Sequence, residues 1–366
     1  MSNDTTLSVP QGGSDGNLFI ASVRGLTQLA GLLAAMTLLF MTLIVFYEVV
    51  MRSVFNAPTS WVAEISVYSF VAMVFFGMGV AQTKGAHIRV EVLLDSVKDE
   101  TRTLLMLLGD WLLLVLVALS GWEMFCFTVS EFINGTRDWG LLATPQWIPE
   151  TPVVIGYALF FFSILQTAFD ERAPKTEARI WAAPAIVLAA IGALALIGRR
   201  DWFPFDWLPV DMATLVITAA ILLIAALWSG ARIAGILLGL LVVMAVLFSY
   251  AQDASLVFTG VLMTVSLLGL LLLGVPVGGT LGMVGLMGLA FTLNTPQLPI
   301  LADRSWTSIN SFTLTAVPAF VLMGTLLVHS GVTVRLFDML VCWFGRARGG
   351  LGHAAIGSSA IFAAVS

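Results

Sequence analysis

Long apolar runs separated by short polar segments extend from residue 25 to residue 329 of this 366-residue chain. A membrane-spanning helix needs about 20 apolar residues, and each run is close to that length. The runs are continuous and lack the period of two that the strands of a membrane barrel show. The pattern predicts an all-α polytopic membrane protein with about ten transmembrane helices. The ten predicted spans are 25–49, 61–83, 103–130, 151–169, 178–198, 211–228, 231–250, 254–273, 276–293 and 311–329.

Two segments outside these spans have patterns of their own. Residues 87–100 (HIRVEVLLDSVKDE) mix apolar and charged positions, which predicts a short helix lying in the membrane interface. Residues 350–366 form a short apolar segment rich in Gly, Ala and Ser. Pro318 lies inside the last span. Interrupted apolar segments of this kind are typical of ion or substrate sites in secondary transporters.

Composition agrees with a membrane protein and excludes several functions. The chain is 59% hydrophobic and 11% charged, whereas a soluble protein has about 25% charged residues. No phosphate-binding loop is present, so we expect no ATP hydrolysis by this chain. Its three histidines have no spacing that would bind haem. We therefore predict that the protein is not an enzyme, has no organic cofactor and binds no nucleic acid.

Basic residues indicate the orientation of the chain. If the N-terminus lies inside, 12 of the 17 Lys and Arg residues fall on the inner side, in agreement with the positive-inside rule. The polar residues 1–24 would then form a disordered cytoplasmic tail. We predict a multi-pass protein with a cytoplasmic N-terminus.

Charged residues near the outer ends of the first two spans are candidates for a structural contact. Glu48 and Arg52 lie four residues apart on the first span, in the favourable order for a helical ion pair. Trp61 and Glu64 open the second span, where Trp is a common interfacial anchor. We predict that Arg52 pairs with both acids and ties the two helices together. The alternative is a role in transport.

Two acids lie within the third span. Asp110 and Glu123 are 13 residues apart in sequence, which is about 20 Å along a helix, while the hydrocarbon core is about 30 Å thick. At least one of them is therefore expected at membrane depth, where an acid needs a partner. We interpret both as hydrogen-bonding groups between helices; the alternative is a proton or ion pathway.

Two stretches of the chain resemble the membrane subunits of TRAP transporters, the tripartite ATP-independent periplasmic carriers. SWVAEI (60–65) and FFGMGVAQTKGAHIRVEVLLDSV (75–97) resemble the small subunit. LLLGVPVGGTLG, SFTLTAVPAFVLMGTLLVHSG and GRARGGLGHAAIGSSAIFAAVS resemble the beginning of the large subunit. The chain is thus similar to a fusion of the two subunits.

The resemblance implies a division of the chain. Residues 1–24 are the tail, 25–170 the four-helix small-subunit domain, and 171–253 a linker with three transmembrane helices. Residues 254–366 are the first part of the large subunit, with scaffold helices at 254–293 and the start of a transport domain at 311–366. A small subunit that ends inside and a large subunit that starts outside require an odd number of linker spans, and three agrees.

The resemblance also implies a function. Such a carrier imports an organic acid together with sodium, by an elevator movement, across the bacterial inner membrane. A periplasmic substrate-binding protein delivers the acid, and lipids surround the helices. The resemblance makes residues 350–366 the start of a re-entrant hairpin. Ser366 matches the first serine of its serine-rich tip and is the expected sodium-binding residue. Because the rest of that tip lies outside this sequence, we expect no transport by this chain alone. The alternative function is a membrane anchor or assembly subunit without transport.

The predicted orientation can be tested by labelling. In a variant without Cys126 and Cys342, a cysteine placed at Val90 should be protected from an impermeant thiol reagent in intact cells. A cysteine placed at Phe205 should react, because the loop around it is predicted outside. Labelling at 90 without labelling at 205 would reverse the orientation.

Overall fold

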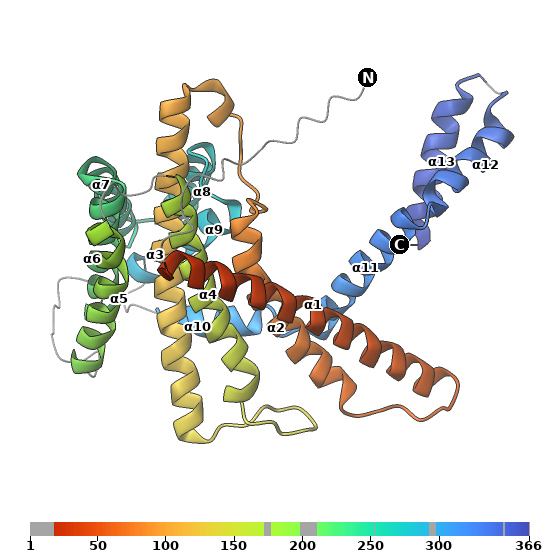
Figure 1. The fold of residues 1–366 in the computed structure, drawn as a ribbon, viewed down its shortest axis with the longest axis horizontal. Helices are drawn as coiled ribbons and strands as arrows, with labels where there is room; N and C mark the ends of the chain where they lie inside the picture. Colours follow the sequence, from red (N-terminus) through yellow and green to blue (C-terminus); the bar gives the residue numbers. More distant parts are fainter. Residues whose placement is uncertain are drawn as a thin grey trace. The chain divides into compact units, whose positions relative to one another are not determined.

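The computed structural model describes residues 18–171, 177–197, 211–252, 254–292, 298–346 and 348–365. In these ranges the chain is helical apart from short connections, and the only strand-like pairing is an isolated bridge between Arg137 and Pro145 (Figure 1). The predicted all-helical class is confirmed for the described part of the chain.

The long helices follow the apolar runs of the sequence. The α-helices are α1 (Leu18–Ser53), α2 (Val62–Thr83), α3 (Asp99–Asn134), α4 (Trp147–Glu171), α5 (Glu177–Ile197), α6 (Met212–Trp228), α7 (Ala231–Ala251), α8 (Leu256–Leu272), α9 (Val277–Phe291), α10 (Ile300–Thr307), α11 (Ala316–His329), α12 (Val332–Phe344) and α13 (Gly350–Val365). Two 3₁₀ turns, η1 (Leu94–Ser96) and η3 (Phe312–Thr315), precede α3 and α11.

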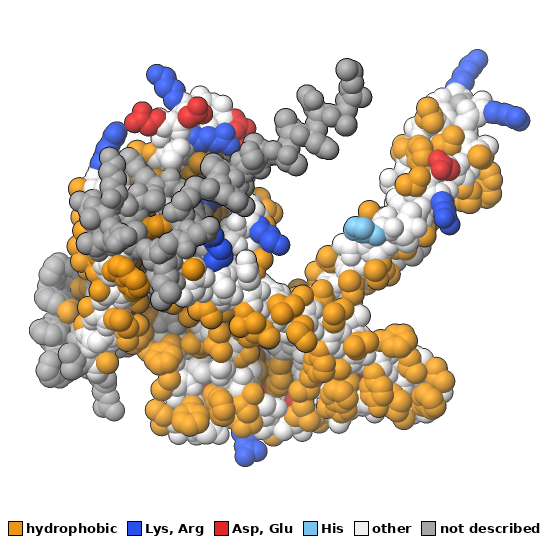
Figure 2. All heavy atoms as spheres, in the orientation of Figure 1, with side chains coloured by type: hydrophobic (Ala, Val, Ile, Leu, Met, Phe, Trp, Pro, Cys, Tyr) orange, Lys and Arg blue, Asp and Glu red, His pale blue; other side chains and the backbone are white. Residues whose placement is uncertain are grey.

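Six helical segments in the described residues are long and apolar enough to cross a membrane. They are Ala21–Ser53, Val62–Thr83, Asp99–Asn134, Trp147–Phe169, Ala231–Ala251 and Phe312–His329. Four shorter apolar helices are Trp181–Ala195, Met212–Trp228, Leu256–Leu272 and Val277–Phe291. Every predicted span overlaps one of these helices. Because four of the helices are short, the number of ten crossings stays a prediction. Figure 2 shows apolar side chains covering the sides of helices, as contact with lipid requires.

The chain forms two compact units. Unit 1 holds the described residues of 1–35, 71–139 and 143–308, and unit 2 holds those of 36–70, 140–142 and 309–366. The first part of α1 and the second part of α2 belong to unit 1, and the remaining parts of both helices belong to unit 2.

Helix α3 is the centre of unit 1. It contacts α4, α6, α7, α9 and α10, and its residues from Leu107 to Leu119 supply much of the buried apolar core. The large side chain of Trp111 is fully buried, and its indole Nε1 donates a hydrogen bond to Ser229 Oγ at 2.9 Å. A buried indole N–H needs such an acceptor, because leaving it unpaired carries a desolvation cost.

Glycines allow helices in unit 1 to approach closely. A side chain at Gly156 of α4 would meet the backbone of Phe75 on α2 at 2.8 Å. The sequence places Gly274, Gly278 and Gly282 on one helical face, which predicts a close contact between helices. Gly282 does face Leu116 of α3, but Gly278 faces open space. The prediction therefore holds for part of that face.

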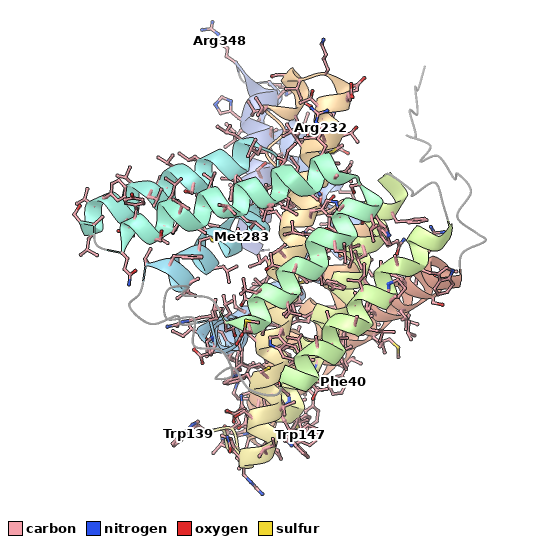
Figure 3. All side chains as sticks on the ribbon, turned by 90° about the vertical axis from the view of Figure 1, so that its left-hand side faces the viewer. Phe40, Trp139, Trp147, Arg232, Met283 and Arg348 are labelled. Carbon is pink, nitrogen blue, oxygen red and sulfur yellow. The ribbon has the colours of Figure 1, made fainter. Side chains whose placement is uncertain are left out.

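The two ends of unit 1 differ in chemistry. In Figure 3, Arg232 lies at the end of unit 1 opposite to Trp139 and Trp147. Arg232 lines the same surface hollow as Glu100 at the start of α3, whereas Trp139 is fully exposed in the connection from α3 to α4. A basic end and a tryptophan-bearing end are typical of a membrane bundle.

The interfacial helix predicted at 87–100 is wrong. In the segment between α2 and α3 the described residues form turns and irregular structure, with a single 3₁₀ turn at Leu94–Ser96. Its apolar residues Ile88, Val90 and Val92 alternate, which is the period of an extended chain rather than of a helix. Ile88 and Val92 are exposed, while Arg89 between them points into the protein.

Unit 2 contains the helices α11, α12 and α13. Pro318 lies in the first turn of α11, directly after η3, so it does not interrupt a helix as the span 311–329 had suggested. The first N–H groups of a helix have no internal acceptor, and proline is tolerated there. Helix α13 packs against α12, where Gly357 faces Leu340. Whether α13 begins a re-entrant hairpin stays a prediction.

The contact at Gly156 predicts a specific loss of stability. Gly156→Ala should separate α4 from α2 and lower the free energy of unfolding by about 1–3 kcal/mol, as overpacking does. The control Gly77→Ala lies on α2 in open space and should be neutral or stabilise by up to about 1 kcal/mol. Thermal melting of the purified variants in detergent measures both. Equal melting temperatures would contradict the close packing.

Candidate functional site

A buried ion pair lies where α2, the following loop and α3 meet in unit 1. Asp110 of α3 is fully buried, and its Oδ1 accepts a hydrogen bond from Arg89 Nη2 at 2.5 Å. Gln82, in the last turn of α2, donates to the same oxygen at 3.3 Å. Asp110 thus has the partner that a buried acid requires, and the partner comes from the loop that was expected to be an interfacial helix.

His87 belongs to the same cluster. Its ring packs against Phe160 of α4, and burial lowers the pKa of the imidazole. The hydrogen bond with the Met78 backbone opposes this effect, and the positive charge of Arg89 adds to it. At neutral pH the ring is therefore uncharged, which keeps a second positive charge away from Arg89.

Three polar atoms of the cluster lack a hydrogen-bond partner among the described residues. They are Asp110 Oδ2, Arg89 Nη1 and His87 Nε2, and all three are buried. A buried ion pair is costly to break, because removal of one member leaves the other charge unpaired. Through the contacts of Asp110 with Gln82 and Arg89, the cluster connects α2, the loop and α3.

The same loop contacts the turn between α8 and α9. Ile88 accepts a hydrogen bond from the backbone N–H of Val277 at 3.0 Å, and Leu94 packs against Gly274. Gly274 has a φ of +81°, and a Cβ there would lie 2.8 Å from Leu94, so conformation and space both favour glycine. The Arg89–Asp110 pair thus holds a loop that is itself attached to the start of α9.

In the structure, Glu48 and Glu64 have hydrogen-bond partners other than the predicted Arg52. In unit 2, Glu48 accepts hydrogen bonds from the backbone N–H and the hydroxyl of Thr59. The Glu64 carboxylate accepts the backbone N–H of Leu142 at 3.2 Å. No ion pair joins Arg52 to Glu64 in the part of the chain that the structure describes. The predicted bridge from Arg52 to Glu64 is wrong, because the backbone N–H of Leu142 satisfies Glu64, whereas the charge of Arg52 does act on Glu48.

The other predicted residues lie apart from one another. Trp61 is half-buried in unit 2, with its ring centroid 6.3 Å from that of Tyr47. Glu123 is buried on α3 and has an interaction partner. Ser366, the expected sodium ligand, lies outside the described residues. Among the residues described, no group of three or more His, Cys, Asp or Glu residues is arranged to hold a metal ion.

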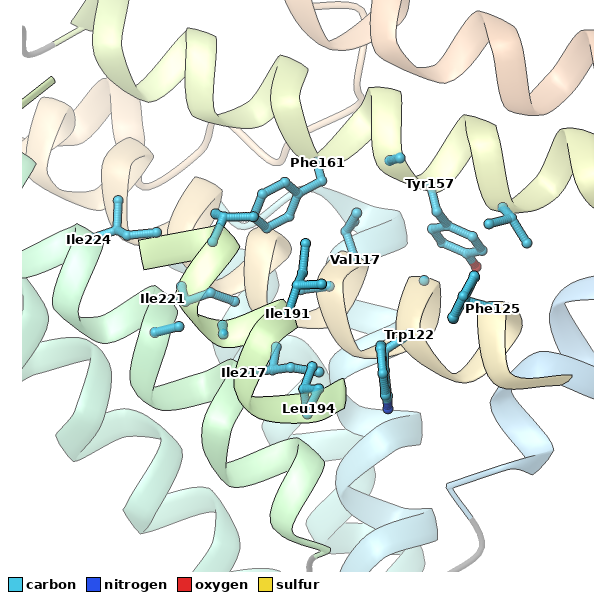
Figure 4. A pocket seen from close by; sticks show the side chains of 17 residues that line it. Val117, Trp122, Phe125, Tyr157, Phe161, Ile191, Leu194, Ile217, Ile221 and Ile224 are labelled. Carbon is cyan, nitrogen blue, oxygen red and sulfur yellow. The ribbon is translucent and has the colours of Figure 1, made fainter. Parts of the chain in front are cut away.

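An apolar cavity of about 400 Å³ lies between α3, α4, α5 and α6 in unit 1. Figure 4 shows Phe161, Ile191, Ile221 and other apolar side chains around it. No charged residue lines the cavity, so it offers no counter-charge to the carboxylate of an organic acid.

Sequence reasoning missed the partners of Asp110. Arg89 and His87 were part of the motif that carried the resemblance, but neither had an assigned role. One signal was available: an acid inside an apolar helix needs a cation nearby, and Arg89 was among the few basic residues near the start of α3. Glu150, fully buried in the first turn of α4, was also missed.

Two family models match the chain. Residues 41–173 match the DctQ component of tripartite ATP-independent periplasmic transporters, and residues 264–366 match the DctM component. The loop that carries Arg89 lies in the first match, and Gly274 and Val277 lie in the second. Their contact therefore joins the two matched parts. The domain boundaries predicted at 170 and 254 stay predictions.

Curated relatives agree with these matches. The chain is 24% identical over 327 residues to the sialic acid TRAP transporter permease protein SiaT of Haemophilus influenzae. That alignment covers 87% of this chain and 44% of the relative, so the chain spans less than half of that protein's length. It is 40% identical over 99 residues to the sialic acid TRAP transporter large permease protein SiaM of Vibrio cholerae, covering 27% of this chain and 23% of the relative.

The first part of the chain has a relative of its own. The C4-dicarboxylate TRAP transporter small permease protein DctQ of Vibrio cholerae is 28% identical over 161 residues, covering 38% of this chain and 69% of the relative.

The buried pair predicts a large effect of one substitution. Asp110→Asn should leave Arg89 without its counter-charge and reduce the free energy of unfolding by about 3–5 kcal/mol. The control is Asp95→Asn, which removes the exposed pair with Arg102, whose atoms are 3.7 Å apart; here the loss should be about 0–1 kcal/mol. Chemical unfolding in detergent measures both. A small loss at Asp110 would show that the pair does not hold the loop.

His87 predicts a dependence of stability on pH. Its pKa in the folded protein lies below the ordinary value of about 6.5, so the unfolded chain binds the proton more readily. The stability from the neutral ring is therefore complete above pH about 6.5 and is lost as the pH falls further. His87→Gln should lack this loss. The melting temperatures of the native chain and of His87→Gln are measured at pH about 7.5 and at pH about 5.5. If the difference between the two proteins is the same at both pH values, the predicted role of His87 is contradicted.

Proposed function

Since the chain belongs to the TRAP transporter family and carries its DctQ and DctM parts in one polypeptide, we propose that it is the membrane component of a secondary carrier. The carrier imports an organic acid with sodium. A periplasmic substrate-binding protein delivers the acid to the membrane part, which lies in the bacterial inner membrane with its N-terminus in the cytoplasm. The names of the relatives, which mention sialic acid and C4-dicarboxylates, support an acid that bears a carboxylate.

The observation that carries the proposal is the contact between the two matched parts. The loop at Arg89 and the turn at Gly274 belong to one compact unit, together with α3 and α9. An elevator carrier needs a fixed part against which another part moves. We assign α8 and α9 to the fixed part, because they pack with α3 and α7. Helices α11 to α13, which cluster in the other unit, are assigned to the start of the moving part.

The basic end of unit 1 supports the orientation. Lys98, Arg102 and Arg232 lie near the start of α3 or line the hollow beside it, and this end would face the cytoplasm. The second candidate function, a membrane anchor or assembly subunit without transport, is favoured by one observation. No charged residue lines the cavity in Figure 4.

Uptake into vesicles tests the proposal. Proteoliposomes that hold the complete protein should accumulate a labelled carboxylate only with an inward sodium gradient and the purified binding protein. The substrates to compare are sialic acid and C4-dicarboxylates. Equal uptake on a proton gradient alone would contradict sodium coupling. Binding of the partner protein without any uptake would favour the anchor.

A further inference from the structure

Helix α12 of unit 2 carries apolar and charged side chains on different faces. Val332, Met339 and Trp343 recur at the spacing of one helical face and form the apolar stripe of α12. Arg335 and Asp338 lie three residues apart and share a second face. The helix has 13 residues and is about 20 Å long, whereas a hydrocarbon core is about 30 Å thick. An amphipathic helix too short to cross a membrane is typical of the membrane surface.

The neighbouring helices cover one side of α12 and leave the apolar stripe exposed. Within unit 2, α12 packs against α11 and α13, and Leu340 is buried where it meets Gly357 of α13. Val332 and Met339 are exposed, and Trp343 has 72% of its surface accessible. Figure 2 shows apolar side chains on the surface of α12. Tryptophan is enriched where a protein meets the boundary between lipid and water, so this stripe fits a lipid layer.

Three arginines lie beside the apolar stripe or soon after it. Arg335 is on α12, and Arg346 and Arg348 follow the end of the helix. All three are exposed, and none of them forms an ion pair with a described residue. In Figure 3 the side chain of Arg348 extends away from the ribbon. Asp338 is the one acid in the sequence from 332 to 348, so three positive charges face a single negative charge.

We propose that α12 lies in the membrane surface and that Arg335, Arg346 and Arg348 bind the headgroups of anionic phospholipids. A guanidinium group donates two parallel hydrogen bonds to a phosphate, so it fits a phospholipid headgroup. The excess positive charge is complementary to a lipid with net negative charge. A soluble anion would meet the arginines but would leave the apolar stripe in water. The stripe and the charges together therefore select a lipid.

The loop at 87–100 shows why mixed charged and apolar residues are not enough for such a site. Arg89 in that loop is paired with the buried Asp110 and is not available to a lipid headgroup. The arginines of α12 and of the turn after it are exposed instead, and they adjoin an exposed apolar stripe. The proposed lipid site is independent of the proposed transport function, because it needs no substrate, sodium or binding protein.

Spin labels test the position of α12 in the full chain, reconstituted in nanodiscs of phosphatidylcholine and phosphatidylglycerol. One label is attached to the native Cys342, which lies four residues after Asp338, in a variant without Cys126. The other is attached at Met339→Cys in a variant that lacks both native cysteines. The label at 339 should collide more with oxygen, which dissolves in hydrocarbon, and the label at 342 more with a polar nickel chelate.

Two outcomes of the spin-label measurement would overturn the proposal. If the label at 339 is protected from both reagents, protein rather than lipid covers the apolar stripe. If the nickel chelate reaches the label at 339 as readily as the label at 342, α12 lies in water.

A lipid titration tests the arginines. The chain without Cys126, in neutral detergent, carries an environment-sensitive fluorophore on Cys342 and receives phosphatidylglycerol or phosphatidylcholine. Phosphatidylglycerol should change the fluorescence at a lower concentration than phosphatidylcholine, and added salt should reduce this difference. In Arg346→Gln/Arg348→Gln the half-saturating concentration of phosphatidylglycerol should rise about 5-fold or more, since one basic residue near an anionic surface contributes about that factor.

Controls separate this site from a general effect of charge. Arg137→Gln/Arg304→Gln removes two exposed arginines of unit 1 and should bind phosphatidylglycerol as the native chain does. Arg346→Lys/Arg348→Lys keeps both charges and should retain most of the affinity. If Arg346→Gln/Arg348→Gln does not fold, Arg335→Gln replaces it in the comparison. Equal responses to the two lipids, equal weakening in the unit 1 control, or the same response to inorganic phosphate alone would overturn the proposal.

Discussion

A charge inside an apolar helix must be compensated within the protein, and this constraint organises the centre of the molecule. Asp110 lies on α3, the helix around which unit 1 is packed. Lipid cannot solvate its carboxylate, so Arg89 must reach it. The loop that carries Arg89 is thereby drawn against α3 and meets the turn before α9. One electrostatic requirement thus positions the loop through which the part that matches DctQ contacts the part that matches DctM.

The contact between these parts also depends on the absence of side chains. Gly274 receives Leu94, and Gly109 of α3 approaches Val275, with 3.3 Å between an added Cβ and the Val275 Cα. Dispersion forces fall off steeply with distance, so such close approach is how helices gain packing energy in a membrane. The ion pair sets the position of the loop, and the glycines allow it to be tightly packed.

Much of this arrangement could be predicted from the sequence. Apolar length alone located the helices, because a membrane permits few other structures. The same rule indicated that Asp110 needs a partner. The loop at 87–100 was predicted wrongly because its alternating apolar residues were combined with charges into a helical pattern. The position of Arg89, between the exposed Ile88 and Val92, is set by a tertiary contact with Asp110 that no local pattern contains.

The error at Arg52 has a different cause. Sequence spacing identifies ion pairs within one helix. Glu48 and Glu64 instead accept hydrogen bonds from Thr59 and Leu142, which lie in loops. Backbone N–H groups occur at every residue except proline, so sequence alone gives no signal for which of them will meet a carboxylate. Glu150 was missed for a related reason, since it lies near the polar start of an apolar run and its burial depends on α3.

The order in which the ribosome produces the chain gives the hydrogen bond of Trp111 a further consequence. Chains emerge from the N-terminus onward, so Arg89 is available before Asp110 is made. The acid therefore meets its partner as soon as α3 is complete. Trp111, on the next position of the same helix, must wait for Ser229, which follows 118 residues later. Until Ser229, directly after α6, has been synthesised, the indole N–H cannot make this hydrogen bond, so this contact in the core of unit 1 needs more of the chain than the first four helices.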